Sequence, residues 1–353
     1  MAKYFQNINE DLMEYFRILS PEIPSFLEEY IDTPVMQKQA EISVSCGMYY
    51  SKLSDIKFFY SSLDHSVAVA LVIWNFTHDK KQTLSGLFHD ISTPVFKHCI
   101  DFLNGDYEKQ ESTEELTTSK IKNSKEIMKL LKRDNIKLEE VSDYHIYPIA
   151  DNDTPKLSAD RLEYTLSNGL GAKKELWNLD EVKEIYQNIE IQKNEENLDE
   201  LGFKDIKITE KFVHIMSKLS NLYIDNKTKL SMQFLADTIK QMNDEKFISK
   251  NDLYEFSEKE VIEKIKNCSD KNIAEKFKKW QETTIVHESE NFVNNKYCKS
   301  IKAKIRYINP LVEINGSEKS NKYIRINEVS EKAKKDIENC LNYKTIKYAY
   351  FDF

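Results

Sequence analysis

Residues 84–98, LSGLFHDISTPVFKH, place a histidine and an aspartate side by side at the end of an apolar run. A second histidine, His98, follows His89 nine positions later. A buried His–Asp pair is unfavourable unless other groups satisfy both side chains. A bound metal ion would satisfy both, so His89 and Asp90 are the first candidate ligands.

Two further residues extend this candidate set. His65 begins the most apolar part of the chain, within DHSVAVALVIWNF, and Asp160 lies in the apolar-flanked segment KLSADRLEYTL. A lone buried histidine is more often a hydrogen-bonded core residue than a ligand, but two of them with two acids favour a shared ion. Imidazole nitrogens and carboxylate oxygens suit Fe, Mn, Co, Ni or Zn and, less well, Mg. The remaining histidines (His78, His145, His214 and His287) lie among polar or aromatic neighbours without a second ligand at useful spacing.

Composition indicates a helical protein of the cytoplasm. Only seven glycines and seven prolines among 353 residues argue against a turn-rich β sandwich or barrel. Five scattered cysteines without a CxxC pair fit reduced thiols. The chain shows neither a membrane-spanning apolar segment nor a secretory signal, so we expect cytoplasmic localisation and no membrane partner.

Periodicity predicts a mainly α fold, a helical bundle with a small C-terminal α+β appendage. Helices are expected at 8–19, from about 25, through DHSVAVALVIWNF as a buried central helix, at 84–90, and within 113–142, 208–242 and 251–285. The acidic stretch 194–202 is predicted as a boundary or surface loop. Strands are expected at 300–308, 321–327 and within 343–353, with a tight turn at Asn315-Gly316 and a helix at 330–341.

These features divide the chain into four predicted regions. They are an N-terminal helical segment (1–50), a metal-binding core (51–190), a helical extension (191–295) and a small α+β region (296–353). The net charge of −8 argues against nucleic acid as the main partner. The alternating basic residues Lys302, Lys304 and Arg306 are typical of the solvated side of a strand.

The ordered series His65, His89-Asp90, Asp160 resembles the H…HD…D signature of the HD-domain phosphohydrolase superfamily. LFHDISTPVFKHCID is similar to the LLHDIGHGPFSHxxD segment of the deoxynucleoside triphosphate triphosphohydrolase branch, and SADRLEYTL is similar to its DRLDYL motif. NDLYEFSEKEVIEKI and KAKIRYINPLV resemble later segments of that branch, so the likeness spans about residues 45–310.

The resemblance implies an HD-domain bundle in which His65, His89, Asp90 and Asp160 bind a divalent metal ion. That ion would polarise the phosphorus centre and lower the pKa of a bound water. His98 would face the substrate phosphates, supported by Asp101. Arg161, Tyr164 and Gln110 would lie along the nucleotide pocket. The branch also usually assembles as homo-oligomers.

Several positions depart from that branch. Ser62 stands where the family has a phosphate-binding arginine, and Ser92-Thr93 replace its Gly-His. Gln110-Glu111 replace a His-Glu pair, and Ser167-Asn168 replace Arg-Asp. The metal ligands are therefore retained while the groups that handle a triphosphate are reduced.

Three functions fit these residues. The first is a metal-dependent phosphohydrolase acting on a phosphorylated small molecule, with a nucleotide as the leading candidate. The second is a true dNTP triphosphohydrolase that uses substitutes for the missing groups. The third is a non-catalytic, metal-stabilised nucleotide-binding or regulatory protein. Retention of all four candidate ligands favours an enzyme over the third, and the reduced set of phosphate-handling groups favours the first over the second.

Overall fold

Helix α5 (Ser62–Thr77) forms the centre of the fold in the computed structural model, which describes residues 3–104, 116–174, 176–314 and 322–353. At its start the Ser61 hydroxyl accepts the backbone N–H of Asp64, while the Asp64 carboxylate accepts that of Ser61. Residues 62–73 are all buried. The prediction of a central helix that is apolar all round is thus confirmed, and this helix carries His65.

Helix α6 (Lys80–Phe88) lies directly against α5, which brings the two candidate histidines together. A Cβ atom at Gly86 would overlap Cδ1 of Ile73 on α5, so any larger residue there would force the Ile73 side chain to shift. Asp79 caps α6 by accepting the backbone N–H groups of Lys81 and Gln82. The helix ends at Phe88, and the candidate ligand His89 is its C-cap.

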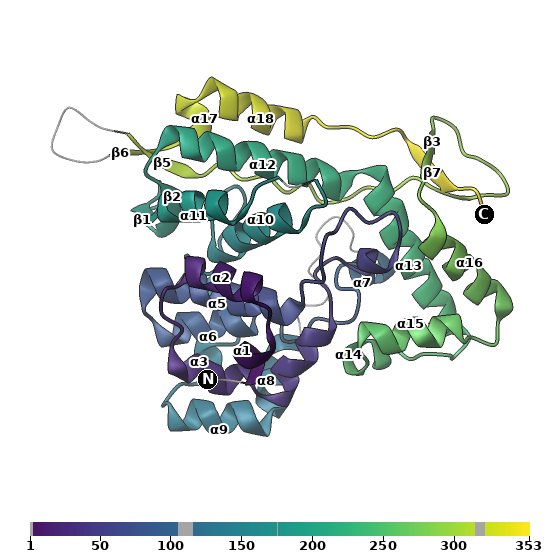
Figure 1. The fold of residues 1–353 in the computed structure, drawn as a ribbon, viewed down its shortest axis with the longest axis horizontal. Coiled ribbons are helices and arrows are strands. Elements are labelled where there is room, and N and C mark those ends of the chain that lie inside the picture. The colour runs from purple at the N-terminus through teal and green to yellow at the C-terminus, as the bar shows by residue number, and fades with distance from the viewer. Residues whose placement is uncertain (1–2, 105–115, 175, 315–321) are drawn as a thin grey trace.

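Shorter helices surround this pair, and Figure 1 shows α1–α3, α8 and α9 gathered with α5 and α6 in one bundle. The expected helix at 8–19 is confirmed as α2, and the helix expected from about residue 25 begins at Ser25. The described part of 113–142 contains α8 and α9. The bounds are α1 (Lys3–Asn7), α2 (Glu10–Leu19), α3 (Ser25–Ile31), α4 (Pro34–Gln37), α8 (Thr117–Asn123), α9 (Lys125–Arg133), α10 (Ala159–Gly171) and α11 (Leu179–Gln187).

Two long helices connect this bundle to a second group. They are α12 (Ile206–Ile224) and α13 (Asn226–Asp244), and the side chain of Asp225 between them caps α13. The expected helical region 208–242 is therefore present but divided. The second group consists of α7 (Cys99–Asn104), α14 (Asp252–Glu255), α15 (Glu258–Lys266) and α16 (Lys271–Glu282). Figure 1 shows α7 beside α13.

A four-stranded sheet in the order β1-β2-β5-β6 lies beside α12. Its strands are β1 (Ile189–Lys193), β2 (Asp199–Phe203), β5 (Leu311–Ile314) and β6 (Lys322–Arg325), and only the β2–β5 pair is parallel. The prediction of a boundary or surface loop over 194–202 is wrong for its second half, which is β2. Glu200 is fully buried there because Arg325 of β6 binds its carboxylate at 2.6 Å, so an acidic residue can occupy the sheet interior.

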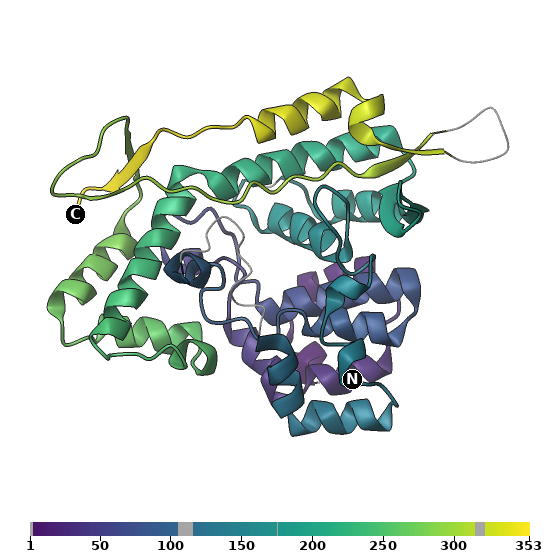
Figure 2. The ribbon, with the colours of Figure 1, turned by 180° about the vertical axis from the view of Figure 1, so that it is seen from behind.

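The predicted strand at 300–308 is also wrong. This segment is extended but joins no ladder, and the strands near it are β4 (Tyr297–Lys299) and β5. Figure 2 shows it running along the α12 side of the molecule. Burial along this segment does not follow the alternation of the sequence. Tyr307 packs on the core while Ile305, which would lie on the same face of a strand, is exposed.

The C-terminal residues complete two sheets that begin earlier in the chain. Strand β7 (Tyr348–Phe351) lies between β3 (His287–Ser289) and β4 in a three-stranded sheet. The expected helix at 330–341 is α18 (Glu331–Leu341), which follows α17 (Ile326–Val329). The expected turn at Asn315-Gly316 lies outside the described residues.

Two apolar clusters make up the core. The first joins the N-terminal bundle to α10–α12 and the four-stranded sheet, and the second joins α7, α13, α15, α16 and β7. The fold is thus mainly α-helical, as predicted. No helix in the described parts of the chain is long and apolar enough to cross a bilayer.

Candidate metal centre

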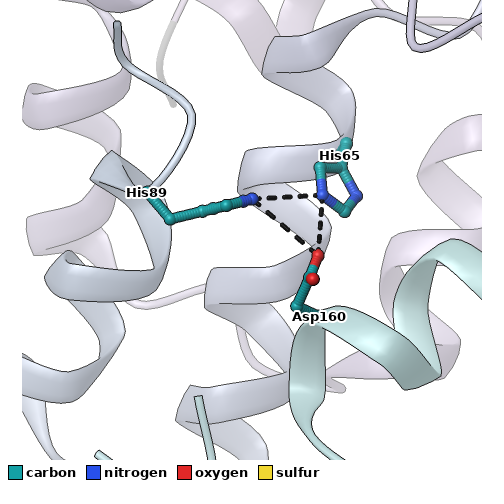
Figure 3. Close-up of side chains that lie close together, drawn as sticks. All are labelled: His65, His89 and Asp160. Atoms are coloured by element: carbon teal, nitrogen blue, oxygen red, sulfur yellow. Dashed lines mark hydrogen bonds and ion pairs between the residues drawn. The ribbon is translucent and has the colours of Figure 1, made fainter. Parts of the chain in front are cut away.

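Three of the predicted ligands converge where α5, the end of α6 and the start of α10 meet. Nε2 of His65 lies 3.2 Å from Nε2 of His89 and 3.0 Å from Oδ1 of Asp160. Nε2 of His89 lies 3.8 Å from the same oxygen. Figure 3 shows the three side chains pointing toward one another. Their candidate ligand atoms all lie within 4.8 Å of one another.

Hydrogen bonds set both imidazoles for metal binding. The Nδ1–H of His89 donates to the carbonyl oxygen of Gly86 at 2.7 Å. Because a carbonyl can only accept, Nδ1 of His89 carries the proton and the Nε2 lone pair faces the triad. Nδ1 of His65 is in contact with the carboxylate of Glu163, which leaves the Nε2 of that ring facing the triad as well.

Glu163 is a further residue of the candidate site, and none of the sequence motifs above included it. Its carboxylate is fully buried and also accepts the hydroxyls of Tyr60 at 2.7 Å and Tyr15 at 3.0 Å. Burial and then the Glu163 charge raise the pKa of both tyrosines, so they remain donors. A signal was available, because residue 163 lies three after Asp160 and shares its side of α10.

The triad's dimensions suit one divalent ion. Two nitrogens each about 2.0–2.1 Å from an ion, at a tetrahedral angle, lie about 3.3 Å apart. The distance between the two imidazole Nε2 atoms is 3.2 Å. Two imidazoles, each of which can be neutral, and a carboxylate are ligands that Zn and the other first-row divalent metals accept.

The local field also favours a cation. Burial alone would lower the pKa of His65, but Glu163 and Asp160 outweigh burial and raise it to about 10. Burial alone would raise the pKa of Asp160, but its interactions with His65 and His89 lower it well below the usual range. In the absence of an ion, the carboxylates therefore attract a proton into the place where a metal cation would bind.

Asp90, the fourth predicted ligand, lies at the edge of the triad. Its Oδ2 is 3.7 Å from Nε2 of His89. Thr93 donates to its Oδ1 at 2.9 Å, while Ser62 at 3.2 Å and the ammonium of Lys97 at 2.5 Å share its Oδ2. Ser62 and Thr93, which depart from the family pattern, therefore both hold the Asp90 carboxylate.

His98 and Asp101 form a second pair near this centre. Nδ1 of His98 lies 2.9 Å from Oδ2 of Asp101, which is fully buried on α7. Desolvation lowers the pKa of His98 against the opposing effect of Asp101. Asp101 holds the ring through Nδ1, as an orienting carboxylate holds a positioned acid or base.

The predicted pocket residues differ in their surroundings. The guanidinium of Arg161 is bound to the loop before α10, with Asn152 Oδ1 at 2.7 Å and Asp151 Oδ1 at 3.2 Å. Tyr164 is one turn beyond Asp160, and burial raises its pKa to about 12 against the charge of nearby Arg306. Gln110 lies outside the described residues.

Comparison with known proteins places the fold. No model of a known protein family matches the chain. The Uncharacterized protein YdhJ of Bacillus subtilis (strain 168) is 24% identical over 328 residues, which cover 89% of this chain and 90% of that protein. Among solved structures, a hypothetical protein from Aquifex aeolicus superposes with a TM-score of 0.64 at 17% identity, over 94% of this chain and 93% of that one.

A phosphohydrolase from Bacteroides thetaiotaomicron VPI-5482 superposes with a TM-score of 0.60 at 13% identity. The match covers 93% of this chain and 96% of the other. At these identities the likeness concerns the fold. The chain therefore shares its mainly helical fold, over almost its whole length, with a protein described as a phosphohydrolase and with one described as hypothetical.

Proposed function

We propose that this protein is a metal-dependent phosphohydrolase of the HD type that acts on a phosphorylated small molecule. The observation that carries the proposal is the pair of Nε2 atoms 3.2 Å apart beside Asp160, with both rings set by hydrogen bonds on Nδ1. Such an arrangement is unfavourable for two neutral imidazoles alone and favourable around a cation. The shared fold with a protein described as a phosphohydrolase supports the reaction class.

The ligands in this proposal are His65, His89 and Asp160, with Asp90 as the fourth. A divalent ion bound there would act as a Lewis acid and supply an acidified water. His98, held by Asp101, would contact the substrate phosphate and transfer a proton through Nε2. Tyr164 and Arg161 would border the pocket, Arg161 by fixing the loop before α10.

We further propose that the substrate is a small phosphoester, such as a nucleoside monophosphate, in place of a dNTP cleaved to tripolyphosphate. Stabilising a tripolyphosphate leaving group needs several cationic groups along the phosphate chain. Ser62 and Thr93 stand where the branch has cationic or proton-transferring side chains, and both bind Asp90 instead. On the basis of the family resemblance, we also propose that the substrate is a nucleotide and that the protein forms homo-oligomers.

The deciding experiment is a screen of phosphorylated metabolites with metal-loaded protein that detects phosphate, pyrophosphate and tripolyphosphate separately. We expect metal-dependent release of inorganic phosphate, lost in His89→Ala. The matched control is His214→Ala, because His214 also pairs with an aspartate, Asp336 at 3.0 Å, away from the site. Failure of the wild-type protein to bind any divalent ion would refute the proposal, and release of intact tripolyphosphate would favour the dNTP alternative.

His98 provides a second test of the same reaction. We expect His98→Ala to retain metal content and Tm while turnover falls by about 10²-fold or more, as for other positioned acid or base groups. Metal analysis, thermal unfolding and steady-state kinetics together check this. A large fall in Tm with little specific loss of turnover would instead identify His98 as a core residue that packs beside Phe96 and Cys99.

A further inference from the structure

Lys97 places a buried positive charge at the edge of the metal centre. Lys97 is only 8% exposed, and its ammonium lies 2.5 Å from Oδ2 of Asp90. A buried lysine is costly unless it is paired, and here its partner is a candidate metal ligand.

The backbone around Lys97 adopts a conformation that ordinary residues avoid. Phe96 has φ 64° and Lys97 has φ 42°, both left-handed. Such a conformation is unfavourable for these residue types and persists only where its surroundings enforce it. Here the backbone N–H of Val95 donates to the carbonyl of Leu253 at 2.8 Å, and that of Phe96 donates to Oε1 of Glu258 at 3.3 Å.

This turn therefore belongs to the second core, although Lys97 reaches the first. Val95, Phe96 and Cys99 pack in the cluster with α13 and α15, whereas Asp90 follows α6 of the N-terminal bundle. The chain thus holds a strained turn of the second core whose lysine contacts Asp90, a residue of the N-terminal bundle. An ion pair on the protein surface would not need a strained turn to hold it in place.

The charges around Asp90 indicate which group the Lys97 ammonium would bind when a metal ion and a substrate are present. Oδ2 of Asp90 is shared between Ser62 and Lys97, and it also faces His89 at 3.7 Å. A divalent cation that shares this carboxylate would weaken the hold of Asp90 on Lys97. The ammonium would then need another anion, and a phosphoryl oxygen of a substrate is the anion that this site is proposed to receive.

We propose that Lys97 is the phosphate-binding cation of this site and competes with the divalent ion for Asp90 when no substrate is present. The inference rests on the proposed function, which it deepens by naming the residue that meets the phosphoryl group. Lys97 lies beside Ser62, so it supplies positive charge where the family arginine is absent. A single ammonium suits a phosphomonoester dianion better than a triphosphate chain.

The test measures two affinities in the purified full-length protein: Mn²⁺ binding to the metal-free form, and inorganic phosphate binding to the Mn²⁺-loaded form. In Lys97→Met we expect Mn²⁺ to bind at least several-fold more tightly, because a competing charge is removed. Phosphate should bind about 10-fold or more weakly, the loss expected for a charge-assisted hydrogen bond. Lys97→Arg should keep most of the phosphate affinity.

Lys229→Met is the matched control, because Lys229 is also buried, at 6% exposure, and hydrogen-bonds Thr345 away from the site. Both of its affinities should equal those of the wild type. If Lys97→Met does not fold, Lys97→Gln provides the same comparison with a polar side chain. Phosphate affinity within twofold of wild type in a folded Lys97 variant would overturn the inference, whereas absence of Mn²⁺ binding in the wild type would overturn the proposed function itself.

Discussion

At the scale of single residues, the candidate metal centre depends on groups outside the triad itself. Glu163 fixes the orientation of His65 and is itself held by Tyr15 and Tyr60. Gly86 fixes His89 through its backbone carbonyl. Such partners set which nitrogen faces the metal, and their loss typically weakens metal binding.

We therefore expect Glu163→Gln to lower metal affinity by about 10–100-fold while the protein stays folded. The amide oxygen can still accept the two tyrosine hydroxyls, but it supplies no negative charge to His65. Competition with a chelator of known affinity measures the effect. The control is Glu200→Gln, another fully buried carboxylate, whose partner is Arg325 outside the site. Equal metal affinity in wild type and Glu163→Gln would contradict this role.

At the scale of elements, the site depends on how closely helices approach. Helices α5 and α6 carry His65 and His89, and Gly86 allows their contact beside Ile73. The turn before α7 is held by Glu258 at the start of α15, whose carboxylate accepts the backbone N–H of Phe96. The packing between these helices thus sets the positions of the candidate ligands, and a change in that packing should alter the site.

Gly86→Val should destabilise the protein by about 1–3 kcal/mol, the usual cost of overpacking, and weaken metal binding because α5 and α6 are pushed apart. Denaturant unfolding and metal titration give the two values. Gly171→Ala is the control: a Cβ there would meet only Phe58, at 3.9 Å. Unchanged metal affinity in a folded Gly86→Val protein would show that the distance between the helices does not set the triad.

Glu258 gives the turn a pH-dependent stability. Burial raises the pKa of its carboxyl to about 8, above the value of about 4.3 in an unfolded chain. Between these pH values the folded state binds more protons than the unfolded state, so stability falls as pH rises from about 4.3 to about 8. Glu258→Gln should remove this contribution.

The measurement is the difference in unfolding free energy between wild type and Glu258→Gln across that pH range. The difference should shift progressively in favour of the variant as pH increases and level off above about 8. A constant difference would mean that the carboxyl group titrates at an ordinary pKa in the folded protein.

At the scale of the whole molecule, the site lies where two apolar cores meet. The triad comes from helices of the first core, and the turn that carries Lys97 and His98 belongs to the second. The four predicted regions, with boundaries after 50, 190 and 295, remain a prediction. Strand pairing crosses the last of them, because β2 pairs with β5 and β3 pairs with β7.

Phe351→Ala should separate the stability of the second core from the metal centre. Phe351 is fully buried on β7 against Phe234, and its truncation should cost about 3–5 kcal/mol. Metal affinity measured under folding conditions should stay close to wild type, because the triad lies in the first core. The exposed Phe292 provides the control, as Phe292→Ala should change neither value. A large loss of metal affinity in Phe351→Ala would show that the two cores form one cooperative unit.

The sequence by itself determined what depends on local pattern. The apolar run of α5 predicted a buried central helix. Histidines and acids flanked by apolar residues predicted four candidate ligands, and three of them, His65, His89 and Asp160, converge in the structure. The helix follows from local periodicity, and the candidate ligands were recognised from the chemistry of their side chains and their order along the chain.

Only the tertiary structure decided the partners of buried charges. The contacts of Glu163 with His65, Lys97 with Asp90 and Arg325 with Glu200 join residues 98, 7 and 125 positions apart. The same holds for the extended segment 300–310, whose alternation is that of a strand but which has no ladder partner. A charge is stabilised, and a strand is formed, by whatever the fold places beside it, and that neighbour is not written in the local sequence.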